Sequence, residues 1–186
     1  MIIVVKDQDR VVIGYTIANQ FGRLASSDYL DTENFALVQK NDYYYGFALM
    51  DRISDLFIYD ELFLNLKVTP DNIINEVIPY IKNKLINNKK MLKNEKWDNA
   101  LVICDNNHIY DISVKLEFNE IEKYVVHGYD EDMITSILDS TPNMPTKERI
   151  IEAFSFVSKL YKEDLFPIAI TDTLTKEIKI IEKGEW

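Results

Sequence analysis

The most reactive side chains in the sequence belong to one cysteine and two histidines. Cys104 lies shortly before His108, and His127 falls in a nearby predicted strand. A thiol beside an imidazole is the arrangement of a cysteine nucleophile with its base, and the three residues together resemble a partial zinc site. However, there is no second cysteine, no paired-ligand spacing, and Cys104 closes an apolar run. The pattern therefore favours a buried structural cysteine, and we expect no metal and no cofactor.

An acidic stretch offers a second set of candidate residues. It contains Asp51, Asp55, Asp60 and Glu61. Asp51 and Asp55 would share one face of a helix, where two carboxylates can hold a divalent ion or act on a glycosidic bond. Solvated helices also carry such pairs, and no calcium-loop glycine pattern accompanies this one. We interpret the stretch as a solvated helix face.

Aromatic side chains are concentrated at Tyr43-Tyr44-Tyr45. Alternate residues of a strand point to opposite faces, so Tyr43, Tyr45 and Phe47 share one face. Such a face can be a ligand platform, a subunit interface or a packing surface under helices, and we favour packing. The glycines form no phosphate loop, and no serine lies in a nucleophile elbow, so signatures of nucleotide binding and of α/β-hydrolases are missing.

The composition is that of an acidic globular protein. The chain has 186 residues, of which 47% are hydrophobic and 28% charged, and we interpret residues 1–186 as a single domain. The net charge of −10 opposes contact with phosphate backbones, so we expect no nucleic-acid partner. The single cysteine suits a reducing compartment, the first apolar run is too short for a signal peptide, and no stretch approaches a membrane span. We therefore expect a cytoplasmic protein without membrane contact.

Hydrophobic periodicity predicts four strands, two helices, three strands, two helices and two strands, in that order. The predicted strands cover residues 2–6, 11–17, 35–39, 43–50, 100–104, 108–113, 123–127, 166–171 and 176–181, and the predicted helices begin near residues 52, 70, 130 and 146. Residues 20–34 are interpreted as a loop, the first helix ends near residue 62, and Pro79 is expected to kink the second. Hairpins dominate and each helix is apolar on one side only. The order therefore predicts an α+β fold, a four-layer α-β-β-α sandwich of largely antiparallel sheets.

This order of elements resembles that of proteasome β-subunits and the bacterial proteasome-like protease, which are N-terminal-nucleophile (Ntn) hydrolases. The segments similar to that family are IIVV (2–5), RVVIG (10–14), YGFALMD (45–51), LVICD (101–105), HIYD (108–111), VHGY (126–129), TKERIIEA (146–153) and FPIAI (166–170). Each motif is short, and the likeness rests on their order and spacing along nearly the whole chain.

The resemblance implies a nucleophile at the N-terminal residue of the mature chain, a threonine, serine or cysteine whose own amine is the base. The matching position here is Met1, which has neither a hydroxyl nor a thiol. The family's aspartate falls near Thr16, its lysine near Glu33 and the serine of its Gly-Ser-Gly turn near Tyr129. An acid in place of the lysine would raise the pKa of a nearby proton acceptor. We interpret these four residues as vestigial cleft positions and expect no catalytic residue.

Cleavage could in principle create a new N-terminal nucleophile. The candidates are Thr16, Ser26, Ser27 and Thr32. Each cut would delete one or both opening strands and leave an exposed sheet edge. We therefore do not expect processing to restore activity.

These observations favour a non-catalytic, proteasome-like protein that acts through assembly or protein binding. The family forms rings, so the resemblance implies self-association or a protein partner. Two alternatives remain open: a peptidase or amidase with an unrecognised or processed nucleophile, and a small-ligand binding domain that uses the old cleft.

Overall fold

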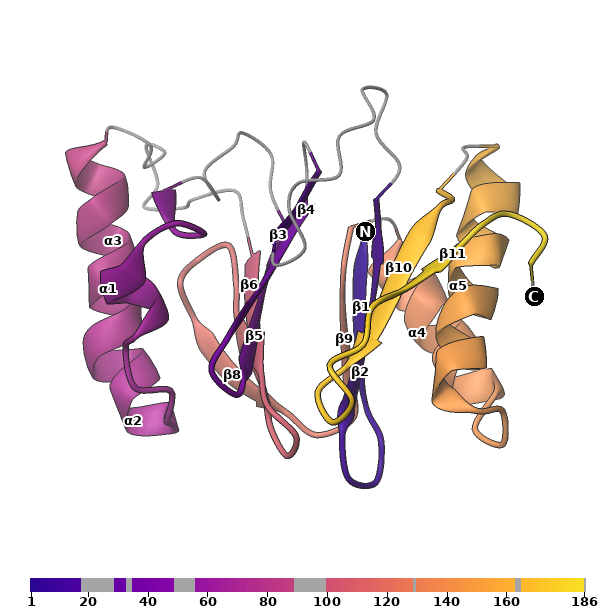
Figure 1. Ribbon diagram of the computed structural model, residues 1–186, viewed down its shortest axis with the longest axis horizontal. Coiled ribbons are helices and arrows are strands. Elements are labelled where there is room, and N and C mark those ends of the chain that lie inside the picture. Colours follow the sequence, from indigo (N-terminus) through magenta and orange to yellow (C-terminus); the bar gives the residue numbers. More distant parts are fainter. Residues whose placement is uncertain are drawn as a thin grey trace.

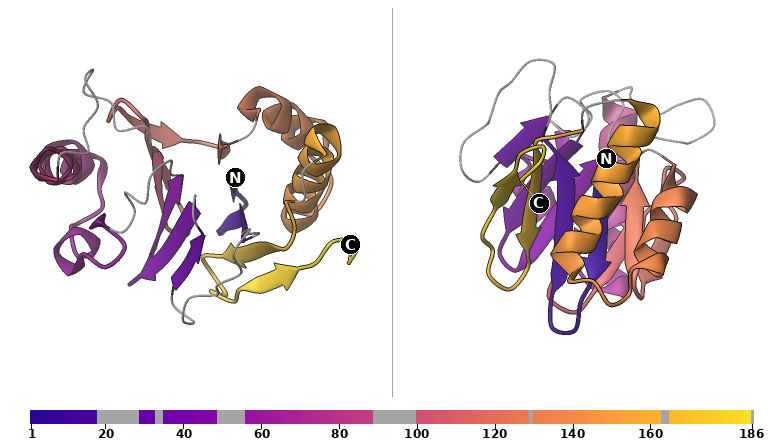
Figure 2. Two further views of the ribbon diagram at one scale, coloured as in Figure 1. Left: turned by 90° about the horizontal axis from the view of Figure 1, so that it is seen from above. Right: turned by 90° about the vertical axis from the view of Figure 1, so that its right-hand side faces the viewer.

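The structure is a computed structural model in which two β-sheets lie face to face between two layers of helices (Figure 1; Figure 2, left). It describes residues 1–17, 29–32, 35–48, 56–88, 100–128, 130–162 and 165–185. The predicted α+β fold, an α-β-β-α sandwich of antiparallel sheets, is confirmed.

The five-stranded sheet combines both ends of the chain. In spatial order its strands are β11 (Lys179–Ile181), β10 (Ile168–Asp172), β2 (Val11–Thr16), β1 (Ile2–Lys6) and β9 (Tyr124–His127). Every neighbouring pair is antiparallel. Because β1 lies between β2 and β9, the start of the chain is held inside the sheet rather than at its edge.

The six-stranded sheet follows the chain order. Its strands are β3 (Tyr29–Thr32), β4 (Phe35–Lys40), β5 (Tyr43–Ala48), β6 (Ala100–Cys104), β7 (Ile109–Ile112) and β8 (Phe118–Ile121). All its pairings are antiparallel. Its outer face is covered by the helices between β5 and β6 (Figure 1).

The helical layer over the six-stranded sheet contains α1 (Glu61–Leu64), α2 (Pro70–Asn72) and α3 (Ile78–Asn87). Thr69 caps α2, since its Oγ1 accepts the Asn72 N–H at 3.3 Å. Residues 73–77 form a π-helical turn before α3, and the Ile78 N–H bonds to the Ile73 carbonyl. Pro79 has no N–H to donate, and its ring needs more space than an α-helical turn leaves. The wider π-helical turn accommodates both, so the predicted kink takes the form of a π-bulge.

The helical layer over the five-stranded sheet consists of α4 (Glu131–Ser140) and α5 (Thr146–Tyr161) (Figure 2, right). Gly14 on β2 lets α5 approach closely, because a Cβ there would lie 3.1 Å from Phe154 Cε2 and collide with Ile150. Within the described ranges, no helix has the length and apolar character needed to cross a bilayer.

Alternation along β1 divides the apolar residues between two cores. Ile2 and Val4 point into the core between the sheets, whereas Ile3 and Val5 point into the core beneath α4 and α5. A third core, which includes Phe47, lies between the six-stranded sheet and the helices α1 and α3.

Two edge strands were missed in the sequence. The described part of the predicted 20–34 loop contains β3, and β8 lies in a stretch to which no element was assigned. Both strands have four residues, and in β8 the middle two are exposed. A four-residue strand is too short to show a clear alternation, and in β8 the exposed middle residues remove it.

The helix predicted from residue 52 to 62 is wrong at residues 57–60. Residues 51–55 lie outside the described residues, residues 57–59 form turns, and α1 starts only at Glu61. The reason is the side chain of Asp60, which accepts the N–H groups of Leu62 and Phe63 and so fixes the helix start after it.

Candidate functional site

A buried methionine occupies the start of β1, where the resemblance implies a nucleophile. Met1 is 1% exposed and belongs to the same core as Val126, Ile134 and Leu138. A thioether carries no proton and is only a weak acceptor. The Met1 side chain therefore fills this position with apolar packing and supplies no nucleophile.

The α-amine of Met1 is also buried and lies against the neighbouring strand. It donates to Thr16 Oγ1 at 2.9 Å, and the Thr16 N–H donates to the Met1 carbonyl at 3.1 Å. Burial lowers the pKa of this amine well below its usual value, which favours its neutral form. An aspartate at position 16 would instead stabilise the charged amine, so the threonine changes the electrostatics of the site.

The threonine hydroxyl and the amine would form a nucleophile–base pair only if a substrate could reach them. Thr16 is 6% exposed, and its Oγ1 accepts the hydrogen bond of the buried amine while its hydroxyl is 3.5 Å from the Met1 carbonyl. The contact between Met1 and Thr16 therefore holds the start of β1 against the end of β2, which is a structural role.

Gly128 covers the other side of the N-terminus. Its φ of 132° is a conformation that side chains rarely adopt, and a Cβ there would lie 3.0 Å from Met1 Cα. The backbone after β9 thus lies directly on Met1. Glu33 and Tyr129, the other two expected cleft positions, lie outside the described residues.

His127, one residue earlier, links three layers of the molecule. Its Nε2 lies 2.7 Å from Asp111 Oδ1 on β7, and its Nδ1 lies 3.4 Å from Glu131 Oε1 on α4. Burial alone would lower the pKa of His127, but the hydrogen bonds and charges of the two carboxylates outweigh it and raise the pKa to about 9. The raised pKa favours the protonated imidazole at neutral pH. Through its two carboxylate contacts the ring connects both sheets and α4.

Sequence reasoning considered His127 only as a partner of Cys104. It missed the contacts of His127 with Asp111 and Glu131, which we call the His127 clamp. The closeness of His127 and Glu131 in the sequence was a local signal, although His127 ends β9 and only Glu131 belongs to α4. Asp111 gave no such signal, since it lies on the opposite sheet and meets His127 only through the fold.

Cys104 and His108 do not form a nucleophile pair. Cys104 is buried between the sheets, and burial raises the pKa of its thiol. The His108 ring stacks on Tyr110 and its Nδ1 lies 3.1 Å from Asp105 Oδ1. The expectation of a structural cysteine agrees with this placement. Among the residues that the structure describes, no group of three or more His, Cys, Asp or Glu side chains could hold a metal.

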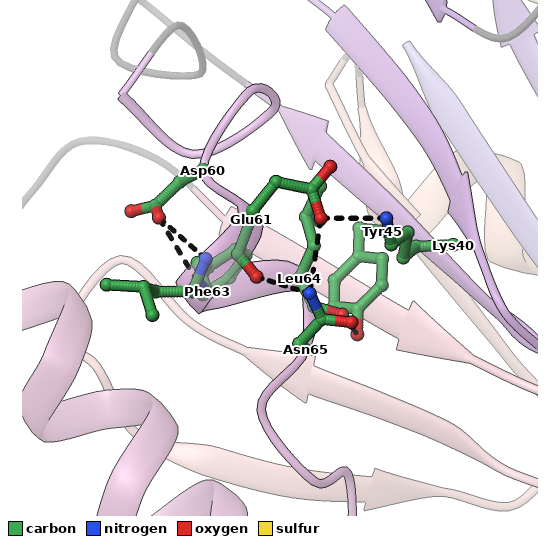
Figure 3. Close-up of polar contacts among 8 residues, drawn as sticks. Lys40, Tyr45, Asp60, Glu61, Phe63, Leu64 and Asn65 are labelled. Carbon is green, nitrogen blue, oxygen red and sulfur yellow. Dashed lines mark hydrogen bonds and ion pairs between the residues drawn. The ribbon is translucent and has the colours of Figure 1, made fainter.

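The acidic stretch acts in local structure where it is described (Figure 3). Asp60 Oδ1 caps α1, while Oδ2 accepts the Tyr80 hydroxyl at 2.6 Å and pairs with Lys84. Burial would raise the pKa of Asp60, but these hydrogen bonds and the Lys84 charge lower it. Glu61 pairs with Lys40 at 2.8 Å. Asp51 and Asp55 lie outside the described residues.

An open pocket of about 410 Å³ lies beside this cluster, on the outer helical layer. It is lined by Leu56, Tyr59, Asp60, Glu61, Leu62, Lys84 and Asn88. The carboxylate of Asp60 is already engaged by four donors, so it has little capacity left for a ligand.

The tyrosines of β5 pack as expected rather than forming a platform. Tyr43 and Tyr45 point towards the helical layer, where their hydroxyls donate to the carbonyls of Val68 at 3.3 Å and Leu64 at 3.4 Å. Tyr44 points between the sheets.

Comparison with known proteins identifies the fold. No family model matches the chain, and no curated protein matches it in sequence. Among solved structures, BPH from Thiobacillus denitrificans is similar with a TM-score of 0.68, 13% identity and coverage of 92% of this chain and 96% of BPH. HslV from Trypanosoma brucei is similar with a TM-score of 0.55, 14% identity and coverage of 92% and 97%.

Anbu (ancestral beta-subunit) from Yersinia bercovieri is similar with a TM-score of 0.58, 12% identity and coverage of 99% of this chain and 88% of Anbu. These are proteasome-like Ntn hydrolases. The chain therefore has the proteasome-like Ntn-hydrolase fold, as its sequence suggested. Identities this low bear on the fold alone.

Proposed function

We propose that this chain is a non-catalytic protein of proteasome-like fold that acts through assembly or protein binding in the cytoplasm. One observation carries the proposal: a fully buried methionine, rather than a threonine, serine or cysteine, stands at the start of β1. Hydrolysis by this fold requires a nucleophile there, and a thioether cannot serve as one.

The surroundings of Met1 support the same conclusion. The neighbouring residue on β2 is Thr16 rather than an acid, and its hydroxyl is engaged by the buried amine. Gly128 lies on the opposite side of Met1. An active hydrolase needs an open path for substrate to the nucleophile, whereas here protein atoms surround the position.

Exposed apolar side chains on the helical layers support a role in assembly or protein binding. The chain exposes apolar side chains on its outer helices, including Leu62, Phe156 and Leu160. Exposed apolar groups on a helical layer are characteristic of surfaces that contact other proteins.

Intact-mass spectrometry with a covalent hydrolase inhibitor tests the proposal. BPH from Thiobacillus denitrificans has been solved in complex with epoxomicin, so BPH serves as the positive control and epoxomicin as the probe. We expect the subunit mass of this chain to remain that of a polypeptide starting at Met1, with no inhibitor adduct. An epoxomicin adduct, or a chain that begins at Thr16, Ser26, Ser27 or Thr32, would refute the proposal.

A further inference from the structure

The outer face of α5 is a narrow stripe on an otherwise buried helix. Seven of its residues are buried: Ile150, Ile151, Ala153, Phe154, Ser155, Val157 and Ser158. A stripe of exposed or partly exposed side chains on one side of the helix consists of Glu148, Glu152, Phe156, Lys159 and Leu160. Tyr161, at the end of the helix, is also exposed. This helix forms the outermost layer on its side of the molecule (Figure 2, right).

The centre of this stripe is apolar. Phe156 is 39% exposed and Leu160 is 46% exposed, one turn apart. Large apolar side chains in adjacent positions on an outer helix gain free energy when a partner removes them from water.

The charges of the stripe are separated along the helix. The acids Glu148 and Glu152 precede Phe156, and the base Lys159 follows it. Within the described part of the chain, neither Glu152 nor Lys159 takes part in an ion pair. Among the described residues, the stripe thus presents acids without an ion-pair partner before its apolar centre, Glu152 being the nearer, and the base Lys159 without such a partner after it.

This pattern is complementary to itself when the helix is reversed. If two copies of α5 pack antiparallel about a two-fold axis between Ser155 and Phe156, Glu152 of each copy lies level with Lys159 of the other. The same axis brings the two Phe156 rings together at the centre. A two-fold contact uses the same patch on both subunits, so self-complementarity is the property it requires.

We propose that α5 pairs antiparallel with α5 of a second copy of this chain, with Phe156 at the centre and two reciprocal Glu152–Lys159 ion pairs around it. This proposal rests on the proposed assembly function and names its partner and surface. One helical stripe is smaller than a standard interface of about 800 Å² per partner, so the pairing should be weak, in the micromolar range.

Charge reversal within α5 tests the pairing by sedimentation velocity of the full chain over a range of concentrations. The single variants Glu152→Lys and Lys159→Glu each place like charges opposite one another, and we expect each to weaken association about tenfold. The double variant E152K/K159E should restore association, and so should an equimolar mixture of the two single variants. Phe156→Glu should abolish dimerisation, because it puts two carboxylates at the centre.

Leu62→Glu is the matched control, because Leu62 is 72% exposed on α1, in the opposite helical layer. It should associate as the wild type does, and circular dichroism should confirm that every variant folds. A wild-type chain that stays monomeric over the whole range overturns the pairing. The pairing is also overturned if Phe156→Glu leaves association unchanged, or if the double variant E152K/K159E does not recover association.

These outcomes separate the two proposals. Association that is independent of α5 overturns the pairing and leaves assembly through another surface in place. A chain that reacts with epoxomicin but dimerises through α5 overturns the non-catalytic function alone.

Discussion

At the scale of single residues, the start of β1 and the imidazole of His127 lie on adjacent strands and stabilise the fold in different ways. Ile2 pairs with His127 in the sheet, so the clamp formed by His127 begins one residue from Met1. Met1 fills the interior with apolar volume, whereas His127 fastens the two sheets and α4 to one another by charge. Met1 and His127 therefore join the elements around the start of β1, one by packing and the other by charge.

The clamp predicts a pH-dependent stability. The pKa of His127 is raised in the folded chain to about 9, from about 6.5 in an unfolded one. Its contribution is therefore fully present below about pH 6.5 and is lost as the pH rises through about 9. We expect His127→Gln to lower the free energy of unfolding by roughly 1–3 kcal/mol at pH 6 and by much less at pH 10.

Urea denaturation of wild type and variant at both pH values measures this difference. His108→Gln is the matched control, because the His108 side chain is 44% exposed and its ion pair is with the nearby Asp105. A His127→Gln defect of equal size at pH 6 and pH 10 would show that the ring acts through packing rather than charge.

At the scale of elements, α1 depends on a single side chain for its start. Asp60 caps the helix with one oxygen (Figure 3). Its other oxygen binds Tyr80 and Lys84 of α3. The helix has only four residues, so its own hydrogen bonds cannot sustain it. Asp60 therefore attaches α1 to α3 as well as starting it.

Substitution of Asp60 separates these two roles. Asp60→Ala removes both the cap and the contacts with α3, and we expect it to cost about 1–3 kcal/mol of unfolding free energy. Asp60→Asn keeps a capping oxygen and should cost about half as much. Glu61→Gln, at an exposed position beside it, should leave the thermal midpoint unchanged. Equal defects in the Ala and Asn variants would assign the whole effect to the charge.

Sequence reasoning predicted the elements with strong apolar patterns and failed where the pattern is weak. The strands β1, β2 and β6 are buried along nearly their whole length and were found. The edge strands β3 and β8 were missed, and the helix predicted from residue 52 to 62 ran through Asp60, which is the N-cap of α1. The placement of Met1 beside Thr16 followed from element order, whereas the His127–Asp111 contact joins strands on opposite sheets and could not be inferred from spacing.

At the scale of the whole molecule, the position of β1 bears on proteolytic processing. Cleavage before Thr16 would remove β1 and nearly all of β2, and with them the strands that join β9 to β10. We expect a chain that begins at Thr16 to be unfolded, with no cooperative thermal transition by circular dichroism. Deletion of residues 183–186, which follow β11, is the control and should preserve the transition. A folded, soluble truncated chain would revive processing as a route to activity.

The same sheet order sets the timing of folding. Thr16 pairs with Ile168 and Ile2 pairs with His127, so the β1–β2 hairpin finds its two outer neighbours only when most of the chain has been translated. Until then the β1–β2 hairpin exposes apolar side chains on both faces. Such long-range contacts slow folding, and unpaired apolar strands invite aggregation. The nascent chain should therefore need protection on the ribosome, with the five-stranded sheet completed last.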